Sequence, residues 1–121
     1  VGDCAWTERV AIDPVLLFRF SALTFNGHRI HYDRPYAMET EKYPGLVVHG
    51  PLQAILLMEA ARRWQPGRRA ANYTFRGLRP LFDFDAVSVC GRTNDAGGLD
   101  LFTANGEGAA GMQATIGWAG T

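Results

Sequence analysis

Lysine is nearly absent from this sequence, and neither sign of charge is in excess. Lys42 is the only lysine beside eleven arginines, and the 12 basic residues balance the 12 acidic ones, so the formal net charge is zero. A balanced chain has no overall electrostatic attraction to nucleic acid or to an anionic membrane surface. We therefore expect neither as a partner. The arginine bias suits phosphate or carboxylate ligands, and a GC-rich genome would produce the same bias.

Cysteine and long apolar runs are scarce as well. Cys4 and Cys90 are far apart in the sequence, and a chain with 47% hydrophobic residues needs no disulfide to fold. No run approaches the roughly 20 apolar residues that cross a bilayer, and the first residues form neither a signal peptide nor an initiator methionine. We expect a single reduced, cytoplasmic domain over residues 1–121, and we interpret it as part of a longer protein.

One strong helix is present. Residues 52–64 combine Leu, Gln, Ala, Met, Glu and Arg, which favour helix, and residues 65–67 (Gln-Pro-Gly) end the run. Gly50 and Pro51 precede it, and Pro51 suits the first helical position because its missing N–H costs nothing there. Apart from Gln53 the first two turns are apolar, and a helix that is apolar nearly all round is predicted to be buried.

Strand-like runs dominate the rest of the chain after the helix. They occupy residues 72–82, 86–94, 99–104 and 111–118. The segments between the last three runs, Asp-Ala-Gly-Gly and Asn-Gly-Glu-Gly, are typical of β-hairpin turns. A buried helix followed by an antiparallel meander predicts an α+β fold, in which an antiparallel sheet wraps around a long central helix at about residues 50–64.

The first 48 residues are harder to assign. We expect an edge strand or arm at residues 6–12, a short helix or turn at 35–41 and a brief strand-like segment at 46–48. The apolar run at residues 15–25 fits either a helix or a strand, because periodicity does not separate the two there. Residues 26–33 are polar, and such a segment is costly to bury unless its groups are paired or used.

All three histidines lie between positions 28 and 49. His28 and His31 have a spacing that could hold a metal ion on a helix, with His49 as a third ligand. Gly27 disfavours a helix there and no second pair of ligands is present, so we expect no metal and no cofactor. A neutral imidazole is the commonest acid-base side chain. From the residues alone, a loop in which the histidines only satisfy polar neighbours stays an open alternative.

Three segments resemble a known family. Residues 20–37 (FSALTFNGHRIHYDRPYA) resemble the hydratase motif of the MaoC-like (R)-specific enoyl-CoA hydratases. Residues 46–52 (LVVHGPL) are similar to that family's lead into its central helix, and residues 75–82 (FRGLRPLF) to the strand that follows. The segments occur in the family's order. Within the family, the chain most resembles the subgroup of mesaconyl-CoA and itaconyl-CoA hydratases and mitochondrial-type 3-hydroxyacyl-thioester dehydratases.

This resemblance implies a hotdog fold and a hydro-lyase that hydrates an enoyl thioester, or dehydrates the 3-hydroxyacyl thioester, on coenzyme A or acyl carrier protein. A short or dicarboxylic acyl group, such as mesaconyl- or itaconyl-CoA, is the expected substrate. It also implies a second hotdog domain as partner, identical or different, with this chain as the C-terminal half of a double-hotdog protein. The mitochondrial matrix then becomes an alternative location.

Other activities stay open beside the implied one. The enzyme alternative is a 3-hydroxyacyl-ACP dehydratase of type 2 fatty-acid synthesis, which would have a long apolar acyl tunnel. A non-catalytic hotdog partner subunit is the alternative from another class. A hotdog thioesterase is disfavoured, since the central helix has no carboxylate near its start and Glu59 lies deep in its third turn.

The resemblance also assigns roles to residues. The family's motif has an aspartate where this chain has Asn26, and an amide cannot take a proton from water. His31 must therefore do more of the acid-base work, with Asn26 holding the water and Asp33 or a backbone carbonyl orienting His31. The Gly50 N–H, at the positive end of the helix, would stabilise the thioester oxygen.

Four further residues are expected to contact the substrate. They are His28, Arg29, His49 and Arg79. Arg79, beside Pro80 in the family-like strand, is the best candidate for an anion contact. A dicarboxylic substrate would bring an extra carboxylate for such an arginine. A core or interface histidine is the alternative role for His49.

Overall fold

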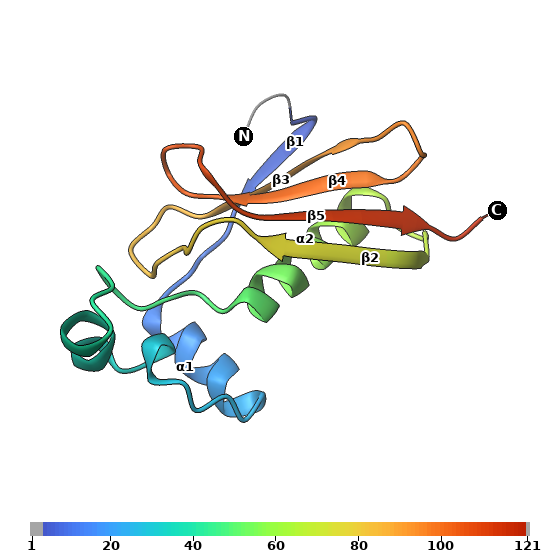
Figure 1. The fold of residues 1–121 in the computed structure, drawn as a ribbon. Helices are drawn as coiled ribbons and strands as arrows, with labels where there is room; N and C mark the ends of the chain where they lie inside the picture. Colours follow the sequence, from blue (N-terminus) through green and yellow to red (C-terminus); the bar gives the residue numbers. More distant parts are fainter. Residues whose placement is uncertain (1–3, 121) are drawn as a thin grey trace.

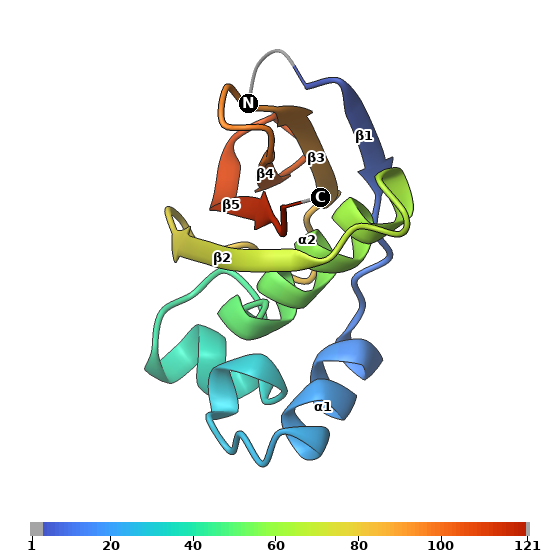
Figure 2. The same ribbon diagram turned by 90° about the vertical axis from the view of Figure 1, so that its right-hand side faces the viewer.

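The computed structural model describes residues 4–120, so the predicted domain limits at residues 1 and 121 lie outside the described residues. A five-stranded antiparallel sheet has the order β1-β3-β4-β5-β2 (Figure 1). The strands are β1 (Trp6–Arg9), β2 (Ala70–Gly77), β3 (Ser88–Thr93), β4 (Leu99–Ala104) and β5 (Ala110–Trp118). The long helix α2 (Gly50–Trp64) lies along one face of the curved sheet (Figure 2). The α+β prediction, with a sheet around a central helix, is confirmed.

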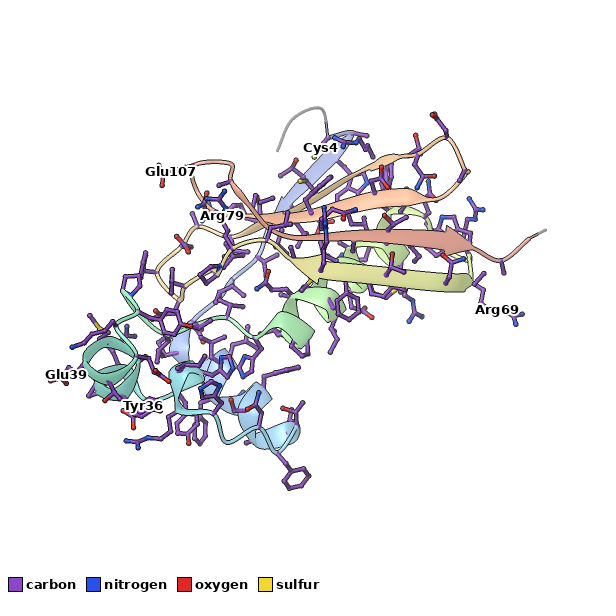
Figure 3. All side chains as sticks on the ribbon, in the orientation of Figure 1. Cys4, Tyr36, Glu39, Arg69, Arg79 and Glu107 are labelled. Atoms are coloured by element: carbon purple, nitrogen blue, oxygen red, sulfur yellow. The ribbon has the colours of Figure 1, made fainter. Side chains whose placement is uncertain are left out.

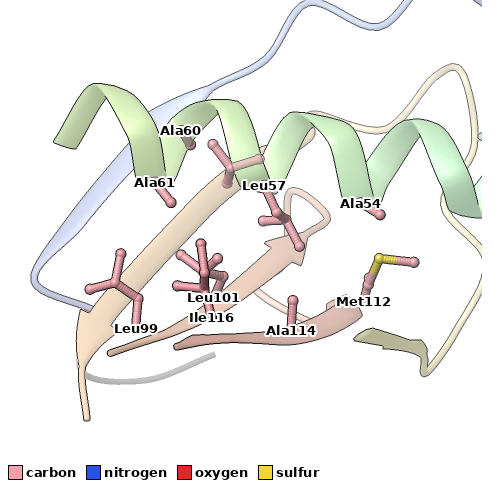
Figure 4. Close-up of a cluster of buried hydrophobic side chains, with 10 residues drawn as sticks. Ala54, Leu57, Ala60, Ala61, Leu99, Leu101, Met112, Ala114 and Ile116 are labelled. Atoms are coloured by element: carbon pink, nitrogen blue, oxygen red, sulfur yellow. The ribbon is translucent and has the colours of Figure 1, made fainter. Parts of the chain in front are cut away.

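Small residues let α2 approach the sheet closely. Ala54, Leu57, Ala60 and Ala61 face the buried side chains of β3, β4 and β5, among them Leu101 (Figure 4). The helix α2 is buried along most of its length, as predicted, but not on every side, because Ile55 is 51% exposed. Pro51 stands at the second helical position rather than the first, since the helix begins at Gly50.

Both predicted hairpins form, and each is fixed by an asparagine and a glycine. Asn94 Oδ1 accepts the backbone N–H groups of Ala96 and Gly98, and Asn105 Oδ1 likewise accepts two N–H groups of the next turn. Gly97 has a φ of 84°, in the left-handed region that glycine enters at little cost. These turns set the register of the β3-β4-β5 meander, since turn geometry fixes register in hairpins.

The undecided run at residues 15–25 is mostly a helix, α1 (Pro14–Leu23). The Asp13 carboxylate accepts the Leu16 N–H at 2.7 Å, a side-chain cap, and Pro14 opens the first turn. The segment at 46–48 makes only an isolated bridge between Val47 and Phe82, so it is not a regular strand.

Two short helical turns follow α1. They are η1 (Arg29–His31), a turn of 3-10 helix, and η2 (Tyr36–Thr40), a single turn of π-helix. Together with α1 they lie on the far side of α2 from the sheet (Figure 2). A second core cluster, which includes Leu17, Ile30, Val47 and Leu52, packs this region against the start of α2. Among residues 4–120 no helix is long and apolar enough to cross a membrane.

Candidate active site

The turn after α1 brings several polar side chains toward the start of α2. Ser21 is buried on the last turns of α1, and its carbonyl accepts the Asn26 N–H at 2.9 Å. Phe25 adopts a φ of 54°, which ends the helix and turns the chain. Asn26 Oδ1 then accepts the His28 N–H at 3.1 Å, a local turn that short amide side chains favour. This turn leads directly into η1, on which His31 lies.

A backbone carbonyl fixes the His31 ring. The side chain is 7% exposed, and its Nδ1 lies 2.7 Å from the Val47 carbonyl oxygen. A carbonyl only accepts hydrogen bonds, so Nδ1 carries the proton and donates it, and the Nε2 lone pair is left to accept a proton. The Val47 N–H donates to the Ile30 carbonyl at 2.9 Å, which ties the same two segments a second time. Of the two predicted orienting groups, the carbonyl is the one present.

The surroundings of His31 favour its neutral form. Burial lowers the pKa of His31, the hydrogen bond to Val47 raises it by less, and the nearby His28 lowers it further. The His28 ring stands edge-on to His31, with 5.8 Å between the ring centroids. A general base requires a neutral imidazole in which one nitrogen is held by a hydrogen bond and the other has a free lone pair.

His49 lies behind His31 and is closed to solvent. The two rings are stacked with centroids 3.7 Å apart, and His49 is 0% exposed. Its Nε2 is 2.8 Å from the Ser21 hydroxyl oxygen, while Nδ1 is buried without a hydrogen-bond partner. Burial first, and the neighbouring His31 second, lower the pKa of His49 to about 4. The full burial of His49 favours the alternative role of a core histidine over the predicted contact with the substrate.

Arg29 and Asp33 bind each other. The guanidinium donates two hydrogen bonds to Asp33 Oδ2, at 3.0 and 2.8 Å, and stands 4.3 Å over the Tyr36 ring. The other Asp33 oxygen accepts the Tyr36 N–H at 3.1 Å. Asp33 makes no hydrogen bond to the His31 ring, so its predicted orienting role is corrected to that of an anchor for Arg29 and the start of η2. The Arg29 guanidinium is already paired with the Asp33 carboxylate, which weakens the prediction that Arg29 binds the substrate.

Asn26 opens onto an apolar hollow of about 430 Å³. Beside Asn26 the hollow is lined by Phe18, Ser21, Ala22, Phe25, Gly27 and Tyr32. The Asn26 carbonyl oxygen is engaged by the His28 N–H, so its amide N–H groups are the donors that remain for a water or a ligand. His28 itself is exposed.

Gly50 opens onto a second hollow, of about 370 Å³, on the side of α2 that faces the sheet. Arg79 lines the same hollow, where its Nε donates to the Ala110 carbonyl at 3.1 Å, and Figure 3 shows it beyond the end of β2. Gly50 has no left-handed φ, and a Cβ there would meet only the Met112 methyl group at 3.9 Å, an ordinary contact. A tight turn therefore does not require this glycine, and its missing side chain leaves the hollow open.

Sequence reasoning missed Gln53 and Ser21. Gln53 is 4% exposed, lines the second hollow and accepts a hydrogen bond from the Thr103 hydroxyl at 2.8 Å. Its signal was visible as the single polar residue in the first two turns of α2. Ser21 had a weaker signal, as one of two hydroxyl residues in the apolar run before Asn26.

Metal-ligand geometry is not found in the part of the chain that the structure describes. No group of three or more His, Cys, Asp or Glu side chains there is arranged to hold a metal ion. His28 and His31 meet edge-on, and His31 Nδ1 is already bound to a carbonyl.

Comparison with known proteins gives one family match. The family model for hydroxyacyl-thioester dehydratase type 2 matches residues 2–83. Mesaconyl-C(4)-CoA hydratase from Chloroflexus aurantiacus is 53% identical over 112 residues, which are 93% of this chain and 39% of that protein. The mitochondrial hydroxyacyl-thioester dehydratase type 2 of Schizosaccharomyces pombe is 37% identical over 94 residues, which are 74% of this chain and 31% of that protein. The chain thus spans well under half the length of both relatives.

Solved structures share the fold. One chain of the ChsH1-ChsH2 complex from Mycobacterium tuberculosis superimposes with a TM-score of 0.80, at 18% identity, over 100% of this chain and 98% of that one. The (R)-hydratase from A. caviae involved in PHA biosynthesis has a TM-score of 0.77, at 18% identity, over 95% of this chain and 94% of that one. At these identities the likeness establishes architecture alone, and it confirms the predicted hotdog fold.

Proposed function

This chain belongs to the hydroxyacyl-thioester dehydratase type 2 family, and from this premise we propose that it hydrates an enoyl thioester, or runs the reverse dehydration, with His31 as the acid-base residue. The observation that carries the proposal is the His31 ring, with its Nδ1 proton held by Val47 and its Nε2 lone pair unspent. The mesaconyl-C(4)-CoA hydratase among its relatives supports the same reaction class.

The water step belongs to His31 and Asn26. His31 Nε2 removes a proton from a water molecule that the Asn26 amide helps to hold. The water oxygen forms a bond to C3 of the enoyl group, and the C2=C3 electron pair moves toward the thioester carbonyl. A positioned imidazole of this kind contributes about 10²- to 10⁴-fold to a rate.

Negative charge then develops on the thioester oxygen. The first-turn N–H groups of a helix have no partner within the helix, and Gly50 supplies such a donor at the start of α2. Protonated His31 returns its proton to C2, which consumes the electron pair and completes the addition of one water. Dehydration follows the same steps backward.

For the substrate we favour a short or dicarboxylic acyl group on coenzyme A. The Arg79 guanidinium at the second hollow supports a carboxylate contact. A second candidate is a 3-hydroxyacyl-ACP dehydratase of fatty-acid synthesis, and the apolar lining of the first hollow favours it, because Phe18, Ala22 and Phe25 would suit a longer chain.

A second hotdog domain is the proposed partner, within a longer chain or as another subunit. Strand β2 lies at an edge of the sheet, and seven of its eight residues are exposed. Exposed Phe75 and Leu78, together with Ile55 on α2, add apolar surface to this edge. An unpaired edge strand with apolar neighbours is a surface that proteins normally cover. This chain would then form the C-terminal half of a double-hotdog protein.

The location that we propose is the cytoplasm, with the mitochondrial matrix as the alternative. Cys4 and Cys90 are free thiols. Thiols persist in reducing compartments.

Initial rates with the purified full-length protein test the proposal. The substrates are crotonyl-CoA, mesaconyl-C(4)-CoA and a ten-carbon enoyl thioester on either coenzyme A or acyl carrier protein. We expect water addition without release of free thiol, with a preference for the dicarboxylic substrate. Preference for the ten-carbon acyl-carrier thioester would select the second candidate. Thiol release would indicate a thioesterase, and a folded protein that hydrates none of these substrates would contradict the proposal.

A further inference from the structure

Gln53 is a buried polar side chain at a position where an apolar one would suffice. It lies among the buried residues Leu52, Ala54 and Leu57 of α2 and is 4% exposed. A carboxamide in such a place is costly unless its groups are bonded or used. Leucine or methionine would fill the space without that cost.

The hydrogen bonds around Gln53 determine which end of its amide faces where. The Thr103 hydroxyl oxygen accepts the Met112 N–H at 2.8 Å, so its own proton is free to be donated to Gln53 Oε1, also at 2.8 Å. The group at the other end of the amide is the Val48 carbonyl, which only accepts, so the carbonyl end of Gln53 faces Thr103 and the NH2 end faces away from it. The NH2 group finds only the Val48 carbonyl at 3.5 Å, the outer limit of a hydrogen bond. Most of its donor capacity is therefore unspent.

Gln53 and Gly50 open onto the same hollow. Both line the cavity of about 370 Å³ beside the start of α2, and residues three apart lie on one face of a helix. His49, the residue that precedes α2, makes no side-chain cap, whereas the Asp13 carboxylate caps the start of α1. The uncapped start of α2 and a carboxamide donor thus line one space that has room for a ligand.

We propose that the Gln53 carboxamide is a further catalytic donor, which binds the carbonyl oxygen of the acyl thioester beside the Gly50 N–H. The proposal rests on the function proposed above. When the water oxygen bonds to C3, the displaced electron pair places charge on the thioester oxygen, and the Gln53 hydrogen bond becomes stronger. The charge leaves that oxygen when C2 is protonated, and Gln53 keeps its own protons throughout. Thr103 is a positioning residue, which holds the donor end toward the substrate.

Gln53→Glu and Gln53→Met test this role in the full-length protein. Gln53→Glu keeps an oxygen for Thr103 and turns the donor into an acceptor, whereas Gln53→Met has no donor at any pH. We expect each variant to lose about 10²- to 10³-fold in kcat at neutral to alkaline pH, as for other donors to a developing oxyanion, with a small change in KM. As the pH falls, the protonated glutamate regains a donor, so the ratio of the Gln53→Glu rate to the wild-type rate rises, while that of Gln53→Met does not.

The matched control is Gln113→Glu, the same chemical change on β5, where the Gln113 side chain bonds to Ala114 and Thr115 of its own strand. It should leave kcat unchanged. A folded Gln53→Met variant with the wild-type kcat would overturn the proposal. So would a loss in Gln53→Glu that does not vary with pH.

A binding measurement separates this proposal from the proposed function. Butyryl-CoA with a ¹³C-labelled thioester carbonyl has no C2=C3 double bond and cannot be hydrated. Its carbonyl stretching frequency should fall when it binds to the wild-type protein and fall by less in Gln53→Met. If the protein hydrates no enoyl thioester but this shift depends on Gln53, only the proposed function fails. If hydration occurs and neither kcat nor the shift depends on Gln53, only the present inference fails.

Discussion

The two residues that lead into α2 turn their backbone groups in opposite directions, and a different polar side chain meets each. Val47 exchanges both of its hydrogen bonds with the segment of Ile30 and His31. Val48 instead donates to the Leu81 carbonyl at 2.9 Å, and its own carbonyl lies 3.5 Å from the Gln53 amide. We call these the histidine side (Ser21, His31 and His49) and the glutamine side (Gln53, Thr103 and Arg79).

The two sides differ in which hydrogen-bonding groups remain available to a ligand. On the histidine side a carbonyl consumes the donor of His31, so a lone pair remains. On the glutamine side the Thr103 hydroxyl donates to Gln53 Oε1, and the N–H donors of the Gln53 carboxamide remain available. Hydration of an enoyl thioester needs a base for water and donors for the thioester oxygen. The comparison teaches that the backbone at the start of α2 leaves an acceptor available on one side and donors on the other, the two kinds of group that the proposed reaction requires.

Removal of the base should have the largest effect on this comparison. We expect His31→Gln to lower kcat for crotonyl-CoA hydration by about 10²- to 10⁴-fold, because no lone pair of suitable pKa then faces the water. His28→Gln changes an exposed ring whose centroid lies 5.8 Å from that of His31. It should lower kcat by less than about tenfold, since one hydrogen bond contributes at most about 1.5 kcal/mol. Equal losses of kcat in His31→Gln and His28→Gln would show that hydration does not depend on the His31 ring in particular.

A fall in pH should lower the stability of the protein through protonation of His49, on the histidine side. The folded-state pKa of His49 is about 4, below its ordinary value of 6.5, so the folded protein binds fewer protons than the unfolded one. The contribution of His49 to the free energy of unfolding is therefore complete above pH 6.5. It falls as the pH drops from 6.5 toward 4, by about 3 kcal/mol over that range. Urea unfolding at several pH values measures this loss. His49→Gln should show a smaller acid loss, and an unchanged one would assign it to other groups.

The hydroxyl of Thr103 should matter more than its size. Thr103→Val leaves the Met112 N–H and Gln53 Oε1 unpaired, which we expect to cost about 1–3 kcal/mol in stability, and about 10²-fold in kcat through misplacement of Gln53. Thr103→Ser retains the hydroxyl and should recover most of the kcat. If the valine and serine variants have the same kcat, Thr103 does not orient a catalytic donor.

Arg79 should produce the smallest and most selective effect. Arg79→Gln removes a charge from the hollow next to Gly50. We expect KM for mesaconyl-C(4)-CoA to rise about tenfold, the effect of losing a charged hydrogen bond of about 1.5 kcal/mol, while KM for crotonyl-CoA stays the same. A parallel rise for both substrates would indicate that Arg79 contacts the carrier or the fold rather than the acyl carboxylate.

Local signals in the sequence predicted the sheet and the helix, and long-range contacts decided the site. Asn and Gly at the hairpin turns, and the composition of α2, act over a few residues and could be recognised directly. The same kind of signal, Asp13 followed by Pro14, was available for α1, but the apolar run after it obscured the choice. The partner of His31 is 16 residues away and that of Gln53 is 50 residues away. No local pattern specifies such pairs, which is why the sequence left Asp33 and a backbone carbonyl as alternative partners of His31.

The most direct test of the central claim is the pH dependence of kcat/KM for crotonyl-CoA hydration, measured for the wild-type full-length protein and for His31→Gln. Burial lowers the pKa of His31, and only the neutral ring accepts a proton. The account predicts that kcat/KM stays constant down to a pH below 6.5, then falls as His31 is protonated, and that this fall is absent from the small residual rate of His31→Gln. A fall centred at or above 6.5, or one that persists in His31→Gln, would contradict it.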